Sequence, residues 1–381
     1  MLIVSLEQAV AAPLATCRLA DAGARVIKVE RPEGDFARGY DVAANGASSY
    51  FAWLNRGKQS IVLDLRDPGD RAVMARLVER ADVFVQNLAV GAAARMGLGA
   101  GELLAADPSL IVCDISGYGD AGPLADAKAY DLLIQAESGL LSVSGPPGPL
   151  GRVGVSVVDI STGLNAAMAI SAALYRRQRT GRGAHLRCSL FDSIAEFMTV
   201  PLLHHDYLGA APERVGLAHP SIAPYGAFDT AEGSALLISV QSDREWVVLC
   251  CDVLDRPDAA DDPRFTTNND RVARRCETDE IVASAFVTMR KATIEARLRA
   301  ARIAYGSIND VADLSVHPHL RRVSVSHEGG TVALPAPAAR ADWEQIGAVP
   351  SIGEHSTAIR SEFAATMQPR RALPPRRPQA G

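Results

Sequence analysis

Residues 2–30, LIVSLEQAVAAPLATCRLADAGARVIKVE, decide the fold class of this chain. Residues 2–6 form a short apolar run, residues 12–22 place apolar side chains at helical spacing, and residues 24–29 (ARVIKV) again have the pattern of a buried strand. A strand, a helix and a second strand in this order form a βαβ unit, whose two strands lie parallel with a right-handed crossover. The opening residues therefore predict an α/β fold built on a parallel sheet.

The same alternation continues beyond residue 30. We expect further strands and helices in turn at 60–64, 69–81, 82–86, 91–106 and 109–114. Two long apolar helices follow, near 160–177 and 188–207, joined by the basic turn RRQRTGRGAH. The pattern predicts a doubly wound, Rossmann-like large domain whose first part covers residues 1–210.

A second domain begins after the segment 212–224, which contains Pro, Gly and His and is typical of a boundary. We expect a smaller α+β domain over residues 225–303 and a return segment to the large domain over 304–367. Residues 368–381, QPRRALPPRRPQAG, are rich in Arg and Pro and predict a disordered tail.

Composition excludes several classes of function. The net charge of −5 offers no broad basic field, so nucleic acid is not expected as a partner. The six cysteines include no CxxC pair or Cys/His cluster with zinc spacing, so we expect no metal and interpret them as reduced thiols. Because Glu7 interrupts the apolar N-terminus and no basic residues precede it, we expect no signal peptide. No stretch of about 18 uncharged apolar residues is present, so we expect no membrane span and a cytoplasmic protein.

A nicotinamide cofactor is a weak alternative. Glu30 ends the second strand, where a dinucleotide-binding protein often has its ribose-binding acid. The first turn, EQAVAAP, contains no glycine, so its backbone cannot approach a pyrophosphate in the usual way.

Asp159 has two interpretations. It lies between an apolar run and a long apolar helix, which is the position of a helix N-cap. In the same place, helix N–H groups would keep its carboxylate ionised and aimed, as a nucleophile that attacks an activated acyl group requires.

Several side chains follow the expected strands at the edge where open α/β sheets bind ligands. They are Arg31, Asn87 and Leu88, with Arg95 in the next helix and Lys128 in a later loop. A cationic set at this edge suits a phosphate-bearing cofactor, although each residue alone is typical of a solvated surface.

The segment VGLAHPSIAPYG (215–226) is either a linker or a loop that closes over a site. His219 within it is a candidate substrate-binding side chain, with a structural histidine in a turn as the alternative.

Seven segments, in their order and spacing, resemble the class III CoA-transferase family, also called the carnitine/bile-acid-inducible type. They are QAVAAPLATCRLADAGARVIKVERPEGD, NRGKQSIVLDLRDP, ADVFVQNLAVGAAARMG, ISGYGDAGP, YDLLIQAESGLLS, VDISTGLNAAMAISAALYRRQRTGRG and HPSIAPYG. The similarity reaches from the opening strand to IGEHS at 352–356.

This resemblance implies that Asp159 is a catalytic nucleophile and that coenzyme A is the carrier. By similarity to formyl-CoA transferase, the CoA contacts fall on Ala9, Arg31, Leu63, Asn87, Leu88, Ala92, Arg95 and Lys128. Val10 stands beside the reacting acyl group where formyl-CoA transferase has Gln, which puts an oxalate-type acceptor in doubt. The glycine-rich mobile loop of that enzyme has no counterpart, because HPSIAP occupies its place.

The family also contains an isomerase, the 2-methylacyl-CoA racemase, which is the alternative function. It uses a His where this chain has Tyr130, paired with an Asp at the position of Asp159. Racemisation needs a base on each face of the α-carbon, and a Tyr of ordinary pKa, near 10, is a poor base at neutral pH. Tyr130, a candidate substrate-binding residue, therefore favours the transferase.

The transferase chemistry implied runs through an aspartyl anhydride and an aspartyl-CoA thioester. The segments ERPEGDFARGYD and SLEQAVAAP look like those of members acting on itaconate, mesaconate or citramalate, with succinyl-CoA as a natural donor. The family resemblance also implies an interlocked homodimer.

Overall fold

The computed structural model describes residues 1–339, 341–343 and 345–364, and they group into two compact units. The larger unit contains residues 1–138, 154–198 and the chain from Arg321 onward, and the smaller one contains 139–153 and 199–320. Each unit has its own buried core.

The larger unit is built on a six-stranded parallel sheet with the order β3-β2-β1-β4-β5-β6. This is the order of Rossmann-type sheets, in which the chain reverses direction between β1 and β4 and leaves a crevice at the carboxyl ends of the strands. The α/β class expected from residues 2–30 is confirmed. The strands are β1 (Leu2–Leu6), β2 (Arg25–Glu30), β3 (Lys58–Val62), β4 (Val83–Gln86), β5 (Ile111–Ser116) and β6 (Ala184–Ser189).

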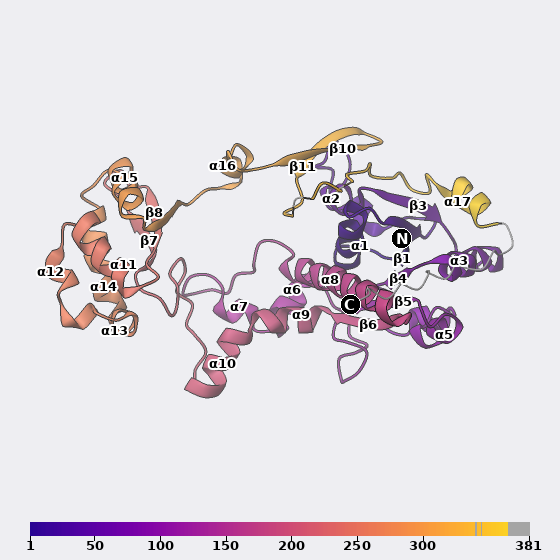
Figure 1. The fold of residues 1–381 in the computed structure, drawn as a ribbon, viewed down its shortest axis with the longest axis horizontal. Coiled ribbons are helices and arrows are strands. Elements are labelled where there is room, and N and C mark those ends of the chain that lie inside the picture. The colour runs from indigo at the N-terminus through magenta and orange to yellow at the C-terminus, as the bar shows by residue number, and fades with distance from the viewer. Residues whose placement is uncertain (340, 344, 365–381) are drawn as a thin grey trace, which may run out of the picture. The chain divides into compact units, whose positions relative to one another are not determined.

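Helices cover this sheet, and α1 (Ala11–Asp21) and α8 (Val157–Thr180) pack closely together (Figure 1). A Cβ atom on Gly163 would lie 2.6 Å from the Ala11 carbonyl oxygen, so only glycine permits this approach. By length and composition α8 could cross a membrane, but its contacts with α1, β5 and β6 are those of a core helix. The close approach fixes the beginning of α8 beside the beginning of α1.

The segment RRQRTGRGAH, expected to be a turn between two helices, instead ends helix α8 and begins the edge strand β6. Helix α8 runs to Thr180, Gly181 ends it in the left-handed conformation, and the chain then enters β6. Alternate side chains of β6 are polar, and His185 pairs with Asp114 of β5 at 2.7 Å. The expected helix 188–207 is also two helices, α9 (Leu190–Phe197) and α10 (Thr199–Leu208).

The remaining elements of the larger unit are short, apart from α3. These elements are η1 (Phe36–Gly39), α2 (Ser49–Asn55), α3 (Pro68–Arg80), α4 (Ala92–Arg95), α5 (Ala100–Ala106), α6 (Asp131–Glu137), β10 (Arg322–His327), β11 (Gly330–Pro335) and α17 (Ser356–Glu362). Helix α17 packs on β3, and the antiparallel hairpin β10–β11 packs over α2.

The smaller unit has a three-stranded antiparallel sheet of order β7-β8-β9, packed against helices around the buried Trp246. Its strands are β7 (Tyr225–Asp229), β8 (Ala235–Ser239) and β9 (Ala304–Ser307). Its helices are α7 (Leu140–Val143), α10, α11 (Asp243–Val248), η2 (Leu249–Val253), α12 (Pro257–Ala260), η3 (Pro263–Phe265), α13 (Asn268–Ala273), α14 (Arg275–Phe286), α15 (Lys291–Ala301) and α16 (Val311–Ser315).

The units differ from the expected domain boundaries at two places. We expected the return segment to start at 304, but β9 pairs with β8, and the chain rejoins the larger unit at Arg321. Residues 139–153 and 199–210, expected in the large domain, group with the smaller unit. The expected tail 368–381 lies outside the described residues.

Candidate active site

The turn that joins β1 to α1 lies at the crevice between β1 and β4. Ala9 adopts φ 64°, a left-handed conformation that residues with a Cβ atom rarely take. The amide group of Asn87, which follows β4, donates to the Gln8 carbonyl at 2.8 Å and accepts the Gln8 N–H at 3.0 Å. Asn87, predicted to contact CoA, thus shapes the turn Gln8–Val10 with both of its polar atoms.

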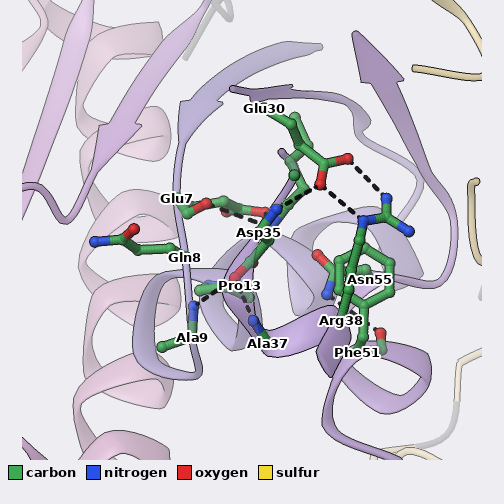
Figure 2. A network of polar contacts seen from close by, with 12 residues as sticks. Glu7, Gln8, Ala9, Pro13, Glu30, Asp35, Ala37, Arg38, Phe51 and Asn55 are labelled. Carbon is green, nitrogen blue, oxygen red and sulfur yellow. Dashed lines mark hydrogen bonds and ion pairs between the residues drawn. The ribbon is translucent and has the colours of Figure 1, made fainter. Parts of the chain in front are cut away.

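A buried ionic network supports the same turn (Figure 2). The side chains of Glu7, Lys28 and Lys58 have no solvent exposure. The Lys58 ammonium lies 2.6 Å from the Glu7 carboxylate, and Lys28 lies 2.7 Å from Asp35. Burial alone would raise the pKa of Glu7, but the two lysines outweigh it and lower the pKa. Asp35 in turn accepts the Ala9 N–H at 3.2 Å.

Asp159, the expected nucleophile, is the third residue of α8 rather than its N-cap. Ser156 holds the cap position without a side-chain hydrogen bond. The carboxylate of Asp131, at the start of α6, instead accepts the N–H of Val158 at 2.8 Å and that of Asp159 at 3.4 Å. The N-cap interpretation of Asp159 is therefore wrong, and the capping carboxylate is Asp131.

The expectation that helix N–H groups keep Asp159 ionised is also wrong. Burial and, second, the charge of Asp131 raise the pKa of Asp159 to about 7. The N–H groups of Val158 and Asp159 are taken by Asp131. Asp159 is thus half-buried and weakly solvated, and its carboxyl group holds its proton more tightly than an exposed aspartate does.

Aromatic and apolar side chains lie in the neighbourhood of this carboxylate. Val10, 3% exposed, packs in one cluster with Tyr50 and with Ile160, the residue that follows Asp159. Burial and then the charges of Asp35 and Asp159 raise the pKa of Tyr40 to about 12, and Tyr130 acts in the same direction. Asp159, Tyr130 and the turn Gln8–Val10 therefore belong to one neighbourhood, as the sequence interpretation required.

A cavity of about 710 Å³ opens beside the turn, at the carboxyl ends of β1, β2 and β3. Three of the predicted CoA contacts, Arg31, Leu63 and Leu88, line it together with Gln8. The Arg31 guanidinium donates to the Gly34 carbonyl at 3.0 Å, which holds this side chain at the rim. A volume of this size is typical of a pocket for a small-molecule ligand or cofactor.

The other predicted contacts lie elsewhere. Ala9 is part of the turn Gln8–Val10, and Asn87 bonds to that turn. Ala92, Arg95 and Lys128 are not among the described residues that line the cavity. His219 belongs to the smaller unit, where its ring stacks on Tyr225 at 5.3 Å between centroids. Its Nδ1 accepts the Ser221 N–H at 3.1 Å, which is the behaviour of a structural histidine in a turn.

Sequence reasoning missed four residues of this site. Arg66 and Arg71 also line the cavity, and both follow β3, where the rule that placed Arg31 at a strand end would have found them. Asp131 and Asp35 were not singled out, because a capping carboxylate and a buried ion pair leave no spacing pattern.

Known proteins resemble this chain over nearly its whole length. The model of CoA-transferase family III matches residues 1–356. The chain belongs to CoA-transferase family III. It is 36% identical over 372 residues to the acetyl-CoA:oxalate CoA-transferase of Acetobacter aceti, covering 96% of this chain and 95% of that protein. It is 34% identical over 378 residues to the succinate–glutarate CoA-transferase of Agrobacterium fabrum, covering 95% and 94%.

Other family III relatives, at 30–33% identity, are succinyl-CoA transferases for mesaconate and D-citramalate. A CAIB/BAIF family protein from Brucella suis has the same fold, with a TM-score of 0.79 at 34% identity, covering 95% of this chain and 98% of that one. The resemblance stated from the sequence is thereby confirmed. The protein is a class III CoA-transferase, an enzyme acting on CoA esters and carboxylates.

Proposed function

We propose that this CoA-transferase moves CoA from succinyl-CoA to a small dicarboxylate through Asp159. The Asp159 carboxylate attacks the thioester carbon, the C–S bond breaks, and an aspartyl anhydride forms while CoA leaves as the thiolate. The thiolate attacks the aspartyl carbonyl, which releases succinate and forms an aspartyl-CoA thioester. The acceptor carboxylate attacks that thioester, the C–S bond breaks, and a second aspartyl anhydride, now carrying the acceptor's acyl group, forms while the CoA thiolate leaves. The thiolate then attacks the acceptor's acyl carbon, which gives the acceptor's CoA ester and frees the Asp159 carboxylate.

The environment of Asp159 is the observation that carries this proposal. Burial and Asp131 raise the pKa of its carboxyl group to about 7. A carboxylate that is poorly solvated and more basic than usual is a better nucleophile toward a thioester than a fully hydrated one. The enzyme then works above neutral pH, where Asp159 is ionised.

The cavity beside the turn Gln8–Val10 supports CoA binding. Arg31, Arg66 and Arg71 line it and can pair with the phosphates of CoA, while Leu63 and Leu88 offer apolar surface. Gln8 lines the cavity and Val10 packs beside Ile160, so one short turn connects the CoA end to the nucleophile.

The proposed acceptor is itaconate, mesaconate or citramalate. Mesaconate and citramalate are acceptors named for two relatives, and all three are compact, branched or unsaturated dicarboxylates. Val10, which packs with Ile160 next to Asp159, is an apolar side chain that suits their methyl or methylene group. The relative named for oxalate makes oxalate the reference acceptor for comparison.

A panel assay tests the proposal. Purified protein is incubated with succinyl-CoA or acetyl-CoA and each of five acceptors: itaconate, mesaconate, citramalate, glutarate and oxalate, and product CoA esters are identified by mass. We expect the highest kcat/KM with succinyl-CoA and one of the three branched or unsaturated acids. A preference for oxalate or glutarate would overturn the assignment of the acceptor but leave the enzyme class intact.

The proposal includes an interlocked homodimer, carried by the family resemblance. Light scattering should then give a mass of about twice the 40.3 kDa of one chain. A mass of a single chain in active protein would contradict it.

A further inference from the structure

We infer that Asp35 is a positioning residue that holds the turn Gln8–Val10 in its left-handed conformation and so fixes the wall of the acyl site beside Asp159. The claim that the turn positions the acyl site rests on the proposed function. The claim that the Asp35 hydrogen bond holds the turn does not. The inference depends on three observations: the backbone conformation of Ala9, the partners of the turn, and the anchoring of Asp35 itself.

Ala9 is one of four non-glycine residues with positive φ in the described parts of the chain. The conformation brings a Cβ atom close to a carbonyl oxygen, so it persists only where the surroundings hold it. Ala9 lies between Gln8, which lines the CoA-sized cavity, and Val10, which packs with Ile160 next to Asp159. A relaxed Ala9 would shift both neighbours relative to the nucleophile.

Two side chains from other parts of the sheet hold this turn. Asn87 satisfies the N–H and carbonyl groups of Gln8, as described above. The Ala9 N–H donates only to Asp35 Oδ1 among the hydrogen bonds of the described residues, at 3.2 Å. Because this N–H belongs to the residue with the disfavoured φ, the Asp35 carboxylate bonds directly to the residue whose conformation must be held.

Asp35 is itself rigidly placed (Figure 2). Its Oδ2 lies 2.7 Å from the buried Lys28 ammonium, its Oδ1 also accepts the Ala37 N–H at 2.9 Å, and its own N–H donates to Glu30 at 3.0 Å. Buried ion pairs give little net stability, because the lost hydration offsets the attraction between the charges. Stability alone therefore does not explain the Lys28–Asp35 pair, whereas its use as a precise anchor for the Ala9 N–H does.

The experiment compares two double variants: Lys28→Met/Asp35→Asn, called the amide variant, and Lys28→Met/Asp35→Leu, called the leucine variant. The Lys28 change accompanies both, so neither variant leaves an unpaired buried lysine, and Glu7 keeps its partner Lys58 at 2.6 Å. The amide variant retains an oxygen that can accept the Ala9 N–H, and the leucine variant does not. With succinyl-CoA and mesaconate as probes, we expect kcat to be about 10- to 100-fold lower for the leucine variant than for the amide variant.

Ala9→Gly separates positioning from a merely structural role, because glycine adopts positive φ without a partner. Added to the leucine variant, it should raise kcat about fivefold to thirtyfold, and added to the amide variant it should raise kcat less. Loss of the Ala37 hydrogen bond, which the same carboxylate also makes, would not be repaired by a change at Ala9. Equal kcat values for the two double variants, or no rescue by glycine, would overturn the inference.

Hydrogen exchange gives a second measurement that needs no turnover. The Ala9 amide, followed in an N-terminal peptide by mass spectrometry, should exchange about tenfold faster in the leucine variant than in the amide variant, because only the amide variant keeps an acceptor for it. Equal exchange in the two folded proteins would overturn the inference. If the wild-type protein transfers no CoA from succinyl-CoA to mesaconate, itaconate or citramalate, the proposed choice of donor and acceptor fails, and the exchange result alone decides the role of Asp35.

Discussion

Replacing Asp159 by Asn should make the protein more stable at alkaline pH. Burial and Asp131 raise the pKa of this carboxyl group from 3.8 to about 7 in the folded protein. The difference of about three pKa units corresponds to about 4 kcal/mol of unfolding free energy, at 1.36 kcal/mol for each unit. Asn has nearly the same shape and carries no charge, so Asp159→Asn removes this penalty.

The sign of the pH dependence follows from the direction of the pKa shift. Because the folded-state pKa lies above the unfolded one, the folded protein binds the Asp159 proton more tightly. The penalty is therefore complete above about pH 7, declines as the pH falls through 7, and disappears below about 3.8. The gain from Asp159→Asn should be large at pH 8 and less than half as large at pH 5.

Thermal unfolding followed by circular dichroism measures this gain. At about 2–4 °C per kcal/mol for a unit of this size, Tm should rise by about 8 °C or more at pH 8. Asp126→Asn, a change at an exposed loop position, is the matched control and should leave Tm unchanged. An Asp159→Asn gain that is the same at pH 5 and pH 8, or a loss of stability at pH 8, would refute the reasoning.

Three further changes test other parts of the site. The acid limb of kcat/KM should lie near pH 7 in the wild type, and Asp131→Asn should move it to lower pH, because it removes the neighbouring charge and keeps the shape of the cap. Gly163→Ala should lower the unfolding free energy by about 1–3 kcal/mol, since its Cβ would lie 2.6 Å from the Ala11 carbonyl, whereas Gly101→Ala, with open space around it, should not. Arg31→Ala should weaken CoA binding by about tenfold in calorimetry, and unchanged affinity would exclude it as a phosphate partner.

The parallel sheet could be predicted because its strands are short apolar runs of β-branched residues separated by amphipathic helices. The strands expected at 2–6 and 82–86 are β1 and β4 within a residue at either end. The edge strand β6 escaped prediction, because an edge strand buries few side chains and its alternate positions carry His185 and Arg187. Its partners, Asp114 and Asp120, are distant in sequence.

Site residues could be predicted where they directly follow a strand in the sequence. Properties that arise from packing between distant segments could not. Arg31, Leu63 and Leu88 follow strands and line the cavity. The protonation of Asp159 could not be predicted, because burial and the cap from Asp131 arise only when α6 meets α8. The left-handed Ala9 was equally hidden, since alanine carries no sequence signal for positive φ.

The most direct test of the central claim is the mass of the enzyme after brief incubation with succinyl-CoA alone at pH 8. We predict an adduct of one CoA less one water, located by peptide mapping on Asp159. Asp159→Asn should bind succinyl-CoA and form no such adduct. A CoA adduct on another residue, or full CoA transfer by Asp159→Asn, would contradict the assignment of Asp159 as the nucleophile.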